Sequence, residues 1–366
     1  MTLHLALSLA GSGYHPASWR VSSLPRVPSA RAYQSLARSA ERGRLDAVLL
    51  GIPVEGSLDR VNAMQLDPLP LLGSLIGVTN HIGLAALWTV DFTEPFHVAR
   101  VFATLDHLSY GRTAWIADMF NTEPLLPLIG KPRECDDLMT YCARAGEFID
   151  VVKELWDSWE DEAFALDKAS GTFVDPDRVH PINHDDRFFN VRGPLNLPRP
   201  PQGNPVLVLR DPPMATARQF VSTVADVILI DGPSASRCHE LRSLAAGRDV
   251  RILANLLCVL DETETAAHER AAMLDEMVTP GTDHARFVGT PAQLVDYFAT
   301  CQQQRACDGF NLLPAVLPDD VDRIIDAVIP LARGRRMFRS EYSGTTLREH
   351  LGFARPRSQY AGAQFG

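Results

Sequence analysis

The chain has 366 residues, of which 46% are hydrophobic and 22% are charged, and its formal net charge is −10. This length is enough for one large or two small globular domains with a substantial core. The acidic balance argues against nucleic acid or an anionic membrane as the main partner, and no apolar run approaches the roughly 18–20 residues that span a bilayer. We therefore expect a cytoplasmic globular protein.

The N-terminal stretch MTLHLALSLAGSGYH contains a short apolar run, as secretion signals do. It has no leading basic residues, however, and LHLALSL at 3–9 is better interpreted as a first strand. The six cysteines include no Cys-x-x-Cys pair. This pattern predicts a reduced cytosolic protein with unremarkable thiols.

Apolar strand-like runs alternate with helix-like stretches along the chain. Each run is nearly continuous in Val, Ile, Leu and Ala, which is typical of parallel strands covered by helices. The predicted strands are 3–9, 46–52, 82–88, 113–119, 205–210, 225–231, 250–260 and 309–316. The predicted helices between and after them include 30–42, 70–79, 94–108, 137–159, 215–223, 235–246 and 319–331.

Eight strand-then-helix units fit a closed (β/α)8 TIM barrel better than an open, doubly wound sheet. A Rossmann dinucleotide site is not expected, because Gly11-Ser12-Gly13 lacks the third glycine of that motif and leads into a loop. We expect residues 1–335 to form the barrel, with an insertion at 160–204 after the fourth unit that contains one strand, FFNVRG. Residues 336–366 are expected to form a C-terminal arm and tail that packs on the barrel or on a second subunit.

Polar residues where a predicted strand ends mark the edge at which barrels of this type place their sites. Thr89 and Asp91 follow the third strand and are expected to face a pocket, with a helix N-cap or rim role for Thr93 and Asp91 as the alternative. His15 follows the first strand, where it either lies at the rim of the site or is an ordinary loop histidine. His15 and Asp91 are the candidates for catalysis.

Two other clusters resemble catalytic or metal-binding material but are interpreted as structural. Asp106 and His107, with Arg112, lie at a predicted helix end and in the following turn, on the face opposite the expected site. The HPINHDD segment at 180–186 has a metal-like spacing, but we interpret it as fixing a loop or lid and expect no metal.

Segments along almost the whole chain carry a resemblance to a known family. They are GSGYHPASWR (11–20), AERGRLDAVLL (40–50), 82–112, EFIDVVKELWDSWEDEA (147–163), 180–206, VGTPAQLVDYF (288–298), DGFNLLP (308–314) and FRSEYSGTTLREHLGFARP (338–356). In this order they resemble the bacterial-luciferase-like flavin monooxygenases, in the group of nitrilotriacetate, pristinamycin and dibenzothiophene-sulfone monooxygenases.

The resemblance implies a barrel that usually forms a homodimer. It also implies reduced FMN, supplied by a separate flavin reductase, which together with O2 oxygenates a small organic substrate beside a C–N or C–S bond. The protein would bind the flavin, exclude water and position the substrate. Coenzyme F420, which related barrels use, is the less favoured cofactor, and nothing identifies the substrate.

This chain departs from the family at several flavin-contact positions. The family has Ala-Asp where this chain has Gly51-Ile52, Ser-Thr-Thr-Tyr where it has 89–92, and Trp-Asn where it has Trp115-Ile116. A His and a Tyr near the start of the long fourth helix are replaced by Leu138 and Cys142 on this alignment. The positions equivalent to flavin contacts are Ile52, Thr89, Val90, Leu138, Cys142, Arg210, Pro213 and Met214.

The turn RDPPMAT at 210–216 is the departure with the clearest physical consequence. The family has Ala-Gly-x-Ser here, a turn that cradles a phosphate with free N–H groups, small residues and a hydroxyl. Pro212 and Pro213 each remove a donor, and Met214 has no hydroxyl, although Arg210 and Arg218 could supply charge. The segment 261–308 is also short compared with the family's substrate-covering insertion.

Two functional hypotheses follow. The chain is either an FMN-dependent monooxygenase with an atypical, weakened flavin pocket, or a non-flavin-binding relative that serves as a partner or binding subunit. Bacterial luciferase gives the precedent for the second, because one of its two homologous subunits lacks the working flavin site. The RDPPMAT turn is the feature that disfavours the usual phosphate contact.

Overall fold

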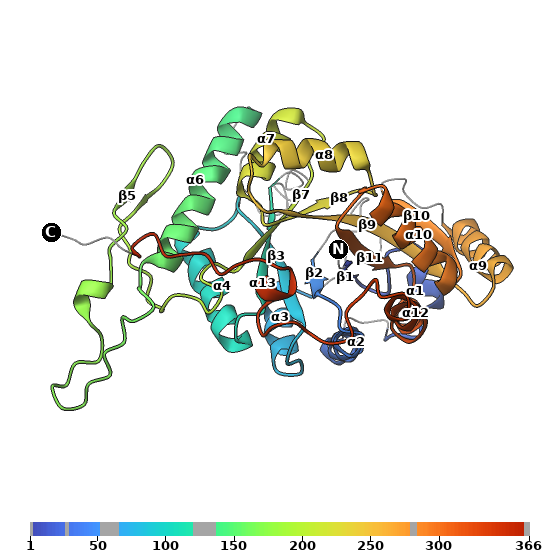
Figure 1. Cartoon of the computed structure of the whole chain (residues 1–366), viewed down its shortest axis with the longest axis horizontal. Coiled ribbons are helices and arrows are strands. Elements are labelled where there is room, and N and C mark those ends of the chain that lie inside the picture. The colour runs from blue at the N-terminus through green and yellow to red at the C-terminus, as the bar shows by residue number, and fades with distance from the viewer. Residues whose placement is uncertain (1–2, 26–28, 52–65, 120–136, 279–283, 362–366) are drawn as a thin grey trace.

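A closed ring of parallel strands forms the centre of the molecule (Figure 1). The computed structural model describes residues 3–25, 29–51, 66–119, 137–278 and 284–361. Its main sheet has the order β10-β9-β11-β1-β2-β3-β4-β7-β8, and an additional pairing between β9 and β8 closes the ring. The predicted (β/α)8 barrel is thereby confirmed.

The ring strands fall on the predicted apolar runs to within two residues at either end. They are β1 (His4–Leu9), β2 (Ala47–Leu50), β3 (Gly83–Thr89), β4 (Thr113–Asp118), β7 (Val206–Arg210), β8 (Val227–Ile230), β9 (Arg251–Leu260) and β11 (Gly309–Pro314). One strand of the sheet, β10 (Ala285–Gly289), was not predicted. It exists because β9 is long: residues 251–254 of β9 pair with β8, and residues 256–260 continue beyond it and pair with β10.

Helices cover the outside of the ring, as parallel strands buried on both faces require. They are α1 (Ser18–Val21), α2 (Ala30–Arg42), α3 (Pro68–Ile76), α4 (Pro95–Ser109), α6 (Leu138–Asp157), α7 (Ala215–Val224), α8 (Ala235–Leu244), α9 (Glu264–Met277), α10 (Pro291–Gln303), α11 (Asp319–Arg323), α12 (Ile329–Gly334) and α13 (Leu347–His350). Among the described helices, none has the length and apolar composition that crossing a membrane requires.

The C-terminal arm closes the amino-terminal end of the barrel of its own chain. Small side chains such as Ala6 and Ala85 line the ring there, which leaves room for α13. Leu347 and Leu351 of α13 are buried against them, and the Leu347 N–H donates to the carbonyl of Gly111 at 2.9 Å. The arm is therefore an apolar plug at one end of the barrel.

Asp106 and Arg112 lie at this same end and have structural contacts. The buried Asp106 carboxylate accepts hydrogen bonds from the Thr113 N–H and from the Gln202 backbone and side chain. The Arg112 guanidinium donates to carbonyls of residues 79, 82 and 109. The end opposite the strands' carboxyl edge thus carries fold contacts, as predicted for these residues.

The insertion forms a short hairpin beside α6, and its second strand lies within the expected FFNVRG strand but covers only two of its residues. Its strands are β5 (His184–Asp185) and β6 (Asn190–Val191), paired antiparallel. The N–H groups of Phe188 and Phe189 donate instead to the Glu147 carboxylate of α6, at 2.7–3.1 Å. The His184 ring lies between Glu147 and Glu154, at 3.4 and 3.0 Å, so this histidine ties the loop to α6.

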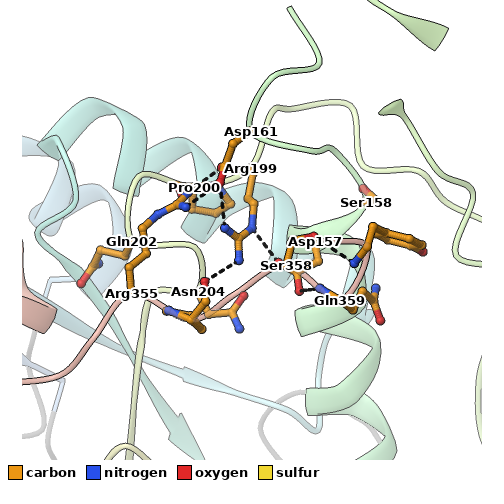
Figure 2. A network of polar contacts seen from close by, with 12 residues as sticks. Asp157, Ser158, Asp161, Arg199, Pro200, Gln202, Asn204, Arg355, Ser358 and Gln359 are labelled. Carbon is orange, nitrogen blue, oxygen red and sulfur yellow. Dashed lines mark hydrogen bonds and ion pairs between the residues drawn. The ribbon is translucent and has the colours of Figure 1, made fainter. Parts of the chain in front are cut away.

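Arg199 joins the insertion, α6 and the arm in one network (Figure 2). Its guanidinium contacts Asp157 at 2.7 Å, Asp161 at 3.3 Å and the carbonyl of Pro356 at 2.9 Å. Arg355 adds two hydrogen bonds of 2.6 Å to Asp161. The Arg199 side chain is only 2% exposed, whereas that of Arg355 is 42% exposed, so the two pairs differ in solvation.

We expect Arg199→Ala to lower the free energy of unfolding by about 3–5 kcal/mol, because it leaves the buried Asp157 carboxylate without its charged partner and with only the Gln359 N–H as a donor among the described residues. Arg355→Ala is the matched control, and its exposed ion pair should contribute less than about 1 kcal/mol. Urea denaturation followed by circular dichroism measures both. Equal losses for the two variants would contradict the assigned role of burial.

Candidate functional site

The carboxyl ends of the ring strands meet at one mouth, and the segment after β3 contributes a carboxylate to it. The Tyr141 O–H at the start of α6 donates to Asp91, with distances of 2.9 and 3.1 Å to its two carboxylate oxygens. The Thr89 hydroxyl accepts the Asp91 backbone N–H at 3.1 Å. Glu94, not Asp91, is the N-cap of α4, so Asp91 is directed to α6 rather than to its own helix.

Tyr141 is a residue that the sequence alignment missed. The alignment placed the family's His and Tyr at Leu138 and Cys142, which are four residues apart. Asp137 and Tyr141 have the same spacing one residue earlier, and Asp137 caps α6 by accepting the Thr140 N–H at 2.9 Å. Shifting the alignment by one residue would therefore have placed the family's tyrosine at Tyr141.

Cys142 and Leu138 do not share the position of Tyr141. Cys142 is buried and lines a groove of about 840 Å³ on the outside of the barrel, between α6, α7 and the insertion. Leu138 is half-buried in the first turn of α6. Neither Leu138 nor Cys142 is therefore the residue of α6 that bonds Asp91; that residue is Tyr141.

His15 is fully buried rather than exposed at a rim. Its Nε2 lies 3.0 Å from a carboxylate oxygen of Asp275 on α9, and its Nδ1 accepts the Ala17 N–H at 3.1 Å. Asp275 also accepts two hydrogen bonds from Arg286 of β10. Burial lowers the pKa of His15 more than Asp275 raises it, so a neutral ring holds the loop after β1 against α9.

A chain of buried polar side chains crosses the inside of the ring. Ser8 of β1 donates to Asn311 of β11 at 3.0 Å, Asn311 donates to Asn255 of β9 at 2.8 Å, and Asn255 donates to Asp231 after β8 at 3.1 Å. Ser8, Asn255 and Asn311 are completely buried. The sequence analysis did not identify these residues, although each asparagine interrupts an otherwise apolar strand, a pattern that indicates a buried polar contact.

Asp231 lies close to Asn255, His284 and Arg210 at the mouth. Burial raises its pKa, but the proximity of His284, the charge of Arg210 and the hydrogen bond from Asn255 outweigh burial, so its pKa lies below the usual value. His284 Nδ1 is 3.5 Å from the carboxylate. Arg210 at the end of β7 therefore lies among charged groups of the mouth, next to an ionised aspartate.

The RDPPMAT turn is held together by Arg218. This guanidinium contacts Asp211 at 3.2 Å, Glu240 at 2.6 Å and the carbonyl of Pro213 at 3.0 Å. Arg218 is thus bonded within the turn, and Arg210, at the end of β7, lies near Asp231.

The first turn of α7 fits a phosphate better than the turn before it. Met214 is the N-cap and makes no side-chain cap hydrogen bond, and residues 213–216 are exposed. The N–H groups at the start of a helix have no intrahelical acceptor and point at an anion. Thr216 also carries a hydroxyl in this turn, two residues after Met214, where the family pattern has its serine.

The remaining predicted positions are dispersed. Val90 is fully buried in the main core, and Thr89 is half-buried. Pro213 and Met214 are exposed at the turn, and Ile52 lies outside the described residues. Within the described ranges there is no group of three or more His, Cys, Asp or Glu side chains that could hold a metal.

Comparison with known proteins gives relatives along the whole chain. A family model described as luciferase-like monooxygenase matches residues 4–316. N-acetyl-S-(2-succino)cysteine monooxygenase of Bacillus subtilis (strain 168) is 32% identical over 98% of each chain. Nitrilotriacetate monooxygenase component A of Aminobacter aminovorans is 30% identical over 96% of each chain.

A solved structure agrees with these relatives. EDTA monooxygenase from Chelativorans sp. BNC1 superposes with a TM-score of 0.84 at 25% identity, over 97% of this chain and 99% of that chain. The alignment with the Bacillus subtilis enzyme runs over 435 positions, more than the 366 residues here, so that relative carries segments which this chain lacks. The chain belongs to the luciferase-like monooxygenase family, which confirms the resemblance inferred from its sequence, and it is an oxidoreductase of the monooxygenase class.

Proposed function

We propose that the chain is the oxygenase component of a two-component system, which uses reduced FMN and O2 to oxygenate a small organic substrate. A separate flavin reductase would supply the reduced FMN, and the chain would act as a homodimer. The observation that carries this proposal is the uncapped, exposed first turn of α7 at the same mouth as Arg210, Asp231 and the Asp91–Tyr141 pair.

The phosphate would be held by α7 rather than by the turn before it. Pro212 and Pro213 have no N–H to donate, and the Pro213 carbonyl faces Arg218. The N–H groups of residues 215–217 and the Thr216 hydroxyl are the donors that remain, assisted by the charge of Arg210. This atypical arrangement has fewer donors in the turn than the family pattern, so it should bind FMN more weakly.

When bound, reduced flavin supplies the electrons that activate O2, and the protein positions the reactants. Tyr141 would hold the Asp91 carboxylate in one orientation at the pocket wall. The buried chain from Ser8 to Asp231 would fix the ionised Asp231 opposite it, because a fully paired polar network is rigid. The carbon or heteroatom that is oxygenated, and hence the substrate, is left open.

The alternative is a partner or binding subunit that does not bind flavin, and the proline pair in the RDPPMAT turn favours it. The two functions differ in one measurable property, which is saturable binding of reduced FMN. F420 is the cofactor alternative within the first function.

Anaerobic titration with reduced FMN, followed by Trp or flavin fluorescence, should give one site per chain with a Kd of about 100 µM. This value corresponds to a micromolar site that has lost one charge-assisted hydrogen bond, at about 2–3 kcal/mol. No saturable binding up to about 1 mM, with the barrel intact by circular dichroism, would favour the partner-subunit alternative.

Thr216→Val should raise this Kd about tenfold, because it removes a hydroxyl donor to the phosphate. Thr223→Val is the matched control: Thr223 is exposed near the other end of the same helix, where its hydroxyl bonds only the carbonyl of Phe220. If both variants bind reduced FMN as the parent does, α7 does not hold the phosphate.

Tyr141→Phe should weaken reduced FMN binding about three- to tenfold, because the Asp91 carboxylate loses the O–H that orients it, a change of about 1 kcal/mol. Tyr110→Phe is the control, since Tyr110 is 81% exposed at the far end of α4. The same fluorescence titration measures both. A Tyr141→Phe protein that binds like the parent would remove this pair from the flavin site.

A further inference from the structure

A second pocket lies at the amino-terminal end of the barrel, away from the mouth. It has a volume of about 400 Å³. Its walls come from α2, from the turn that leads into β2, from the segment that leads into β3 and from the C-terminal arm. The lining residues are Arg38, Glu41, Arg42, Arg44, His81, Glu341, Tyr342 and Gly344.

Three arginines and two glutamates line this pocket, and one of the arginines, Arg42, pairs with Asp326 outside it at 2.9 Å. One oxygen of Glu41 already accepts the N–H groups of residues 80, 81 and 82, at 2.6–3.0 Å. Glu341 is 79% exposed and contacts Arg44 at 3.4 Å. Arg38 is exposed and has no ion pair among the residues that the structure describes. Arg38 and Arg44 are therefore the guanidinium groups of this pocket that an anion from solution can reach.

Further cations lie directly behind the pocket. Arg339 pairs with the buried Asp46, yet its Nη1 is buried and has no hydrogen-bond partner. Its guanidinium lies 5.8 Å from the centre of the Tyr342 ring. Burial, and after it the charge of Arg44, lowers the pKa of Arg333 nearby. Two further guanidinium groups therefore lie next to Arg44 and Tyr342.

The floor of the pocket is aromatic and fixed. Tyr342 stacks on His81 with ring centroids 5.4 Å apart, and its O–H donates to the carbonyl of Leu45 at 3.0 Å. On its other side Tyr342 packs on His350, at 4.7 Å. A rigid apolar floor below guanidinium groups lowers the local dielectric, which strengthens their attraction for an anion.

We propose that this pocket binds a phosphate-class anion, held by Arg38 and Arg44, which replaces the Glu341 carboxylate as the partner of Arg44. Guanidinium groups recognise phosphate through two parallel N–H donors. Arg38 lies on α2 and Arg44 in the turn after it, so the anion binds at the end of α2, beside Tyr342 of the arm. This site is separate from the flavin site and independent of the proposed oxygenase function.

Calorimetric titration with inorganic phosphate at constant ionic strength tests the proposal. The parent protein should bind phosphate at this site with a millimolar Kd, and Arg38→Gln should raise the Kd about tenfold, the effect of one lost charged hydrogen bond. Glu341→Gln should tighten binding about threefold or more, because it removes the competing carboxylate. Tighter binding by a variant is a result that misfolding cannot produce.

Arg100→Gln is the control, because Arg100 is an exposed arginine on α4 and does not line the pocket. Phenyl phosphate distinguishes the two sources of the anion: tighter binding than inorganic phosphate indicates a phosphate ester with a ring on Tyr342, and equal binding indicates the free ion. Phosphate binding that Arg38→Gln and Glu341→Gln leave unchanged overturns the proposal, as does the absence of binding in the parent protein.

Discussion

Pairing of β9 with β8 at one end and with β11 along its length closes the ring, and this closure determines where every other group lies. Because all ring strands are parallel, their carboxyl ends come together at one mouth. Arg210, Asp231 and Asp91 follow three different strands, yet the ring brings them to the same edge. The buried asparagines of the neighbouring strands β9 and β11 then link β1 to the segment after β8 by hydrogen bonds.

The two ends of the barrel have different tasks. At the amino-terminal end, α13 fills the ring with leucines, and buried ion pairs such as Arg199 with Asp157 fasten the arm and the insertion to α6. At the carboxyl end, charged and hydroxyl groups collect and the first turn of α7 leaves its N–H groups uncapped. Stability contacts and candidate reactive groups are therefore separated by the length of the strands, which lets the mouth depart from the family pattern while the barrel remains intact.

The fold could be predicted from the sequence because continuous apolar runs report burial on both faces, whatever the partner strand. The strand β10 could not, because Arg286 interrupts its run and its pairing depends on the unusual length of β9. The site was harder to predict for a related reason. Tyr141 contacts Asp91 because of the side of α6 on which it lies, and an alignment shifted by one residue places a different side chain there. Arg218 is bonded to Asp211 and Glu240, and nothing in the sequence marks these two residues as its partners. The pattern of apolar residues in a sequence predicts which side chains are buried, but the hydrogen-bond partners of a polar side chain depend on the tertiary structure.

Flavin binding at the mouth, with the first turn of α7 as the phosphate contact, is the property on which the proposed function depends. Hydrogen–deuterium exchange with and without reduced FMN, read by mass spectrometry, tests this most directly because it locates the ligand without knowledge of the substrate. The account predicts slower exchange in peptides that cover residues 89–91, 138–142 and 210–217, with residues 341–350 unchanged. Protection confined to the outer groove of α6, or no protection at saturating reduced FMN, would contradict it.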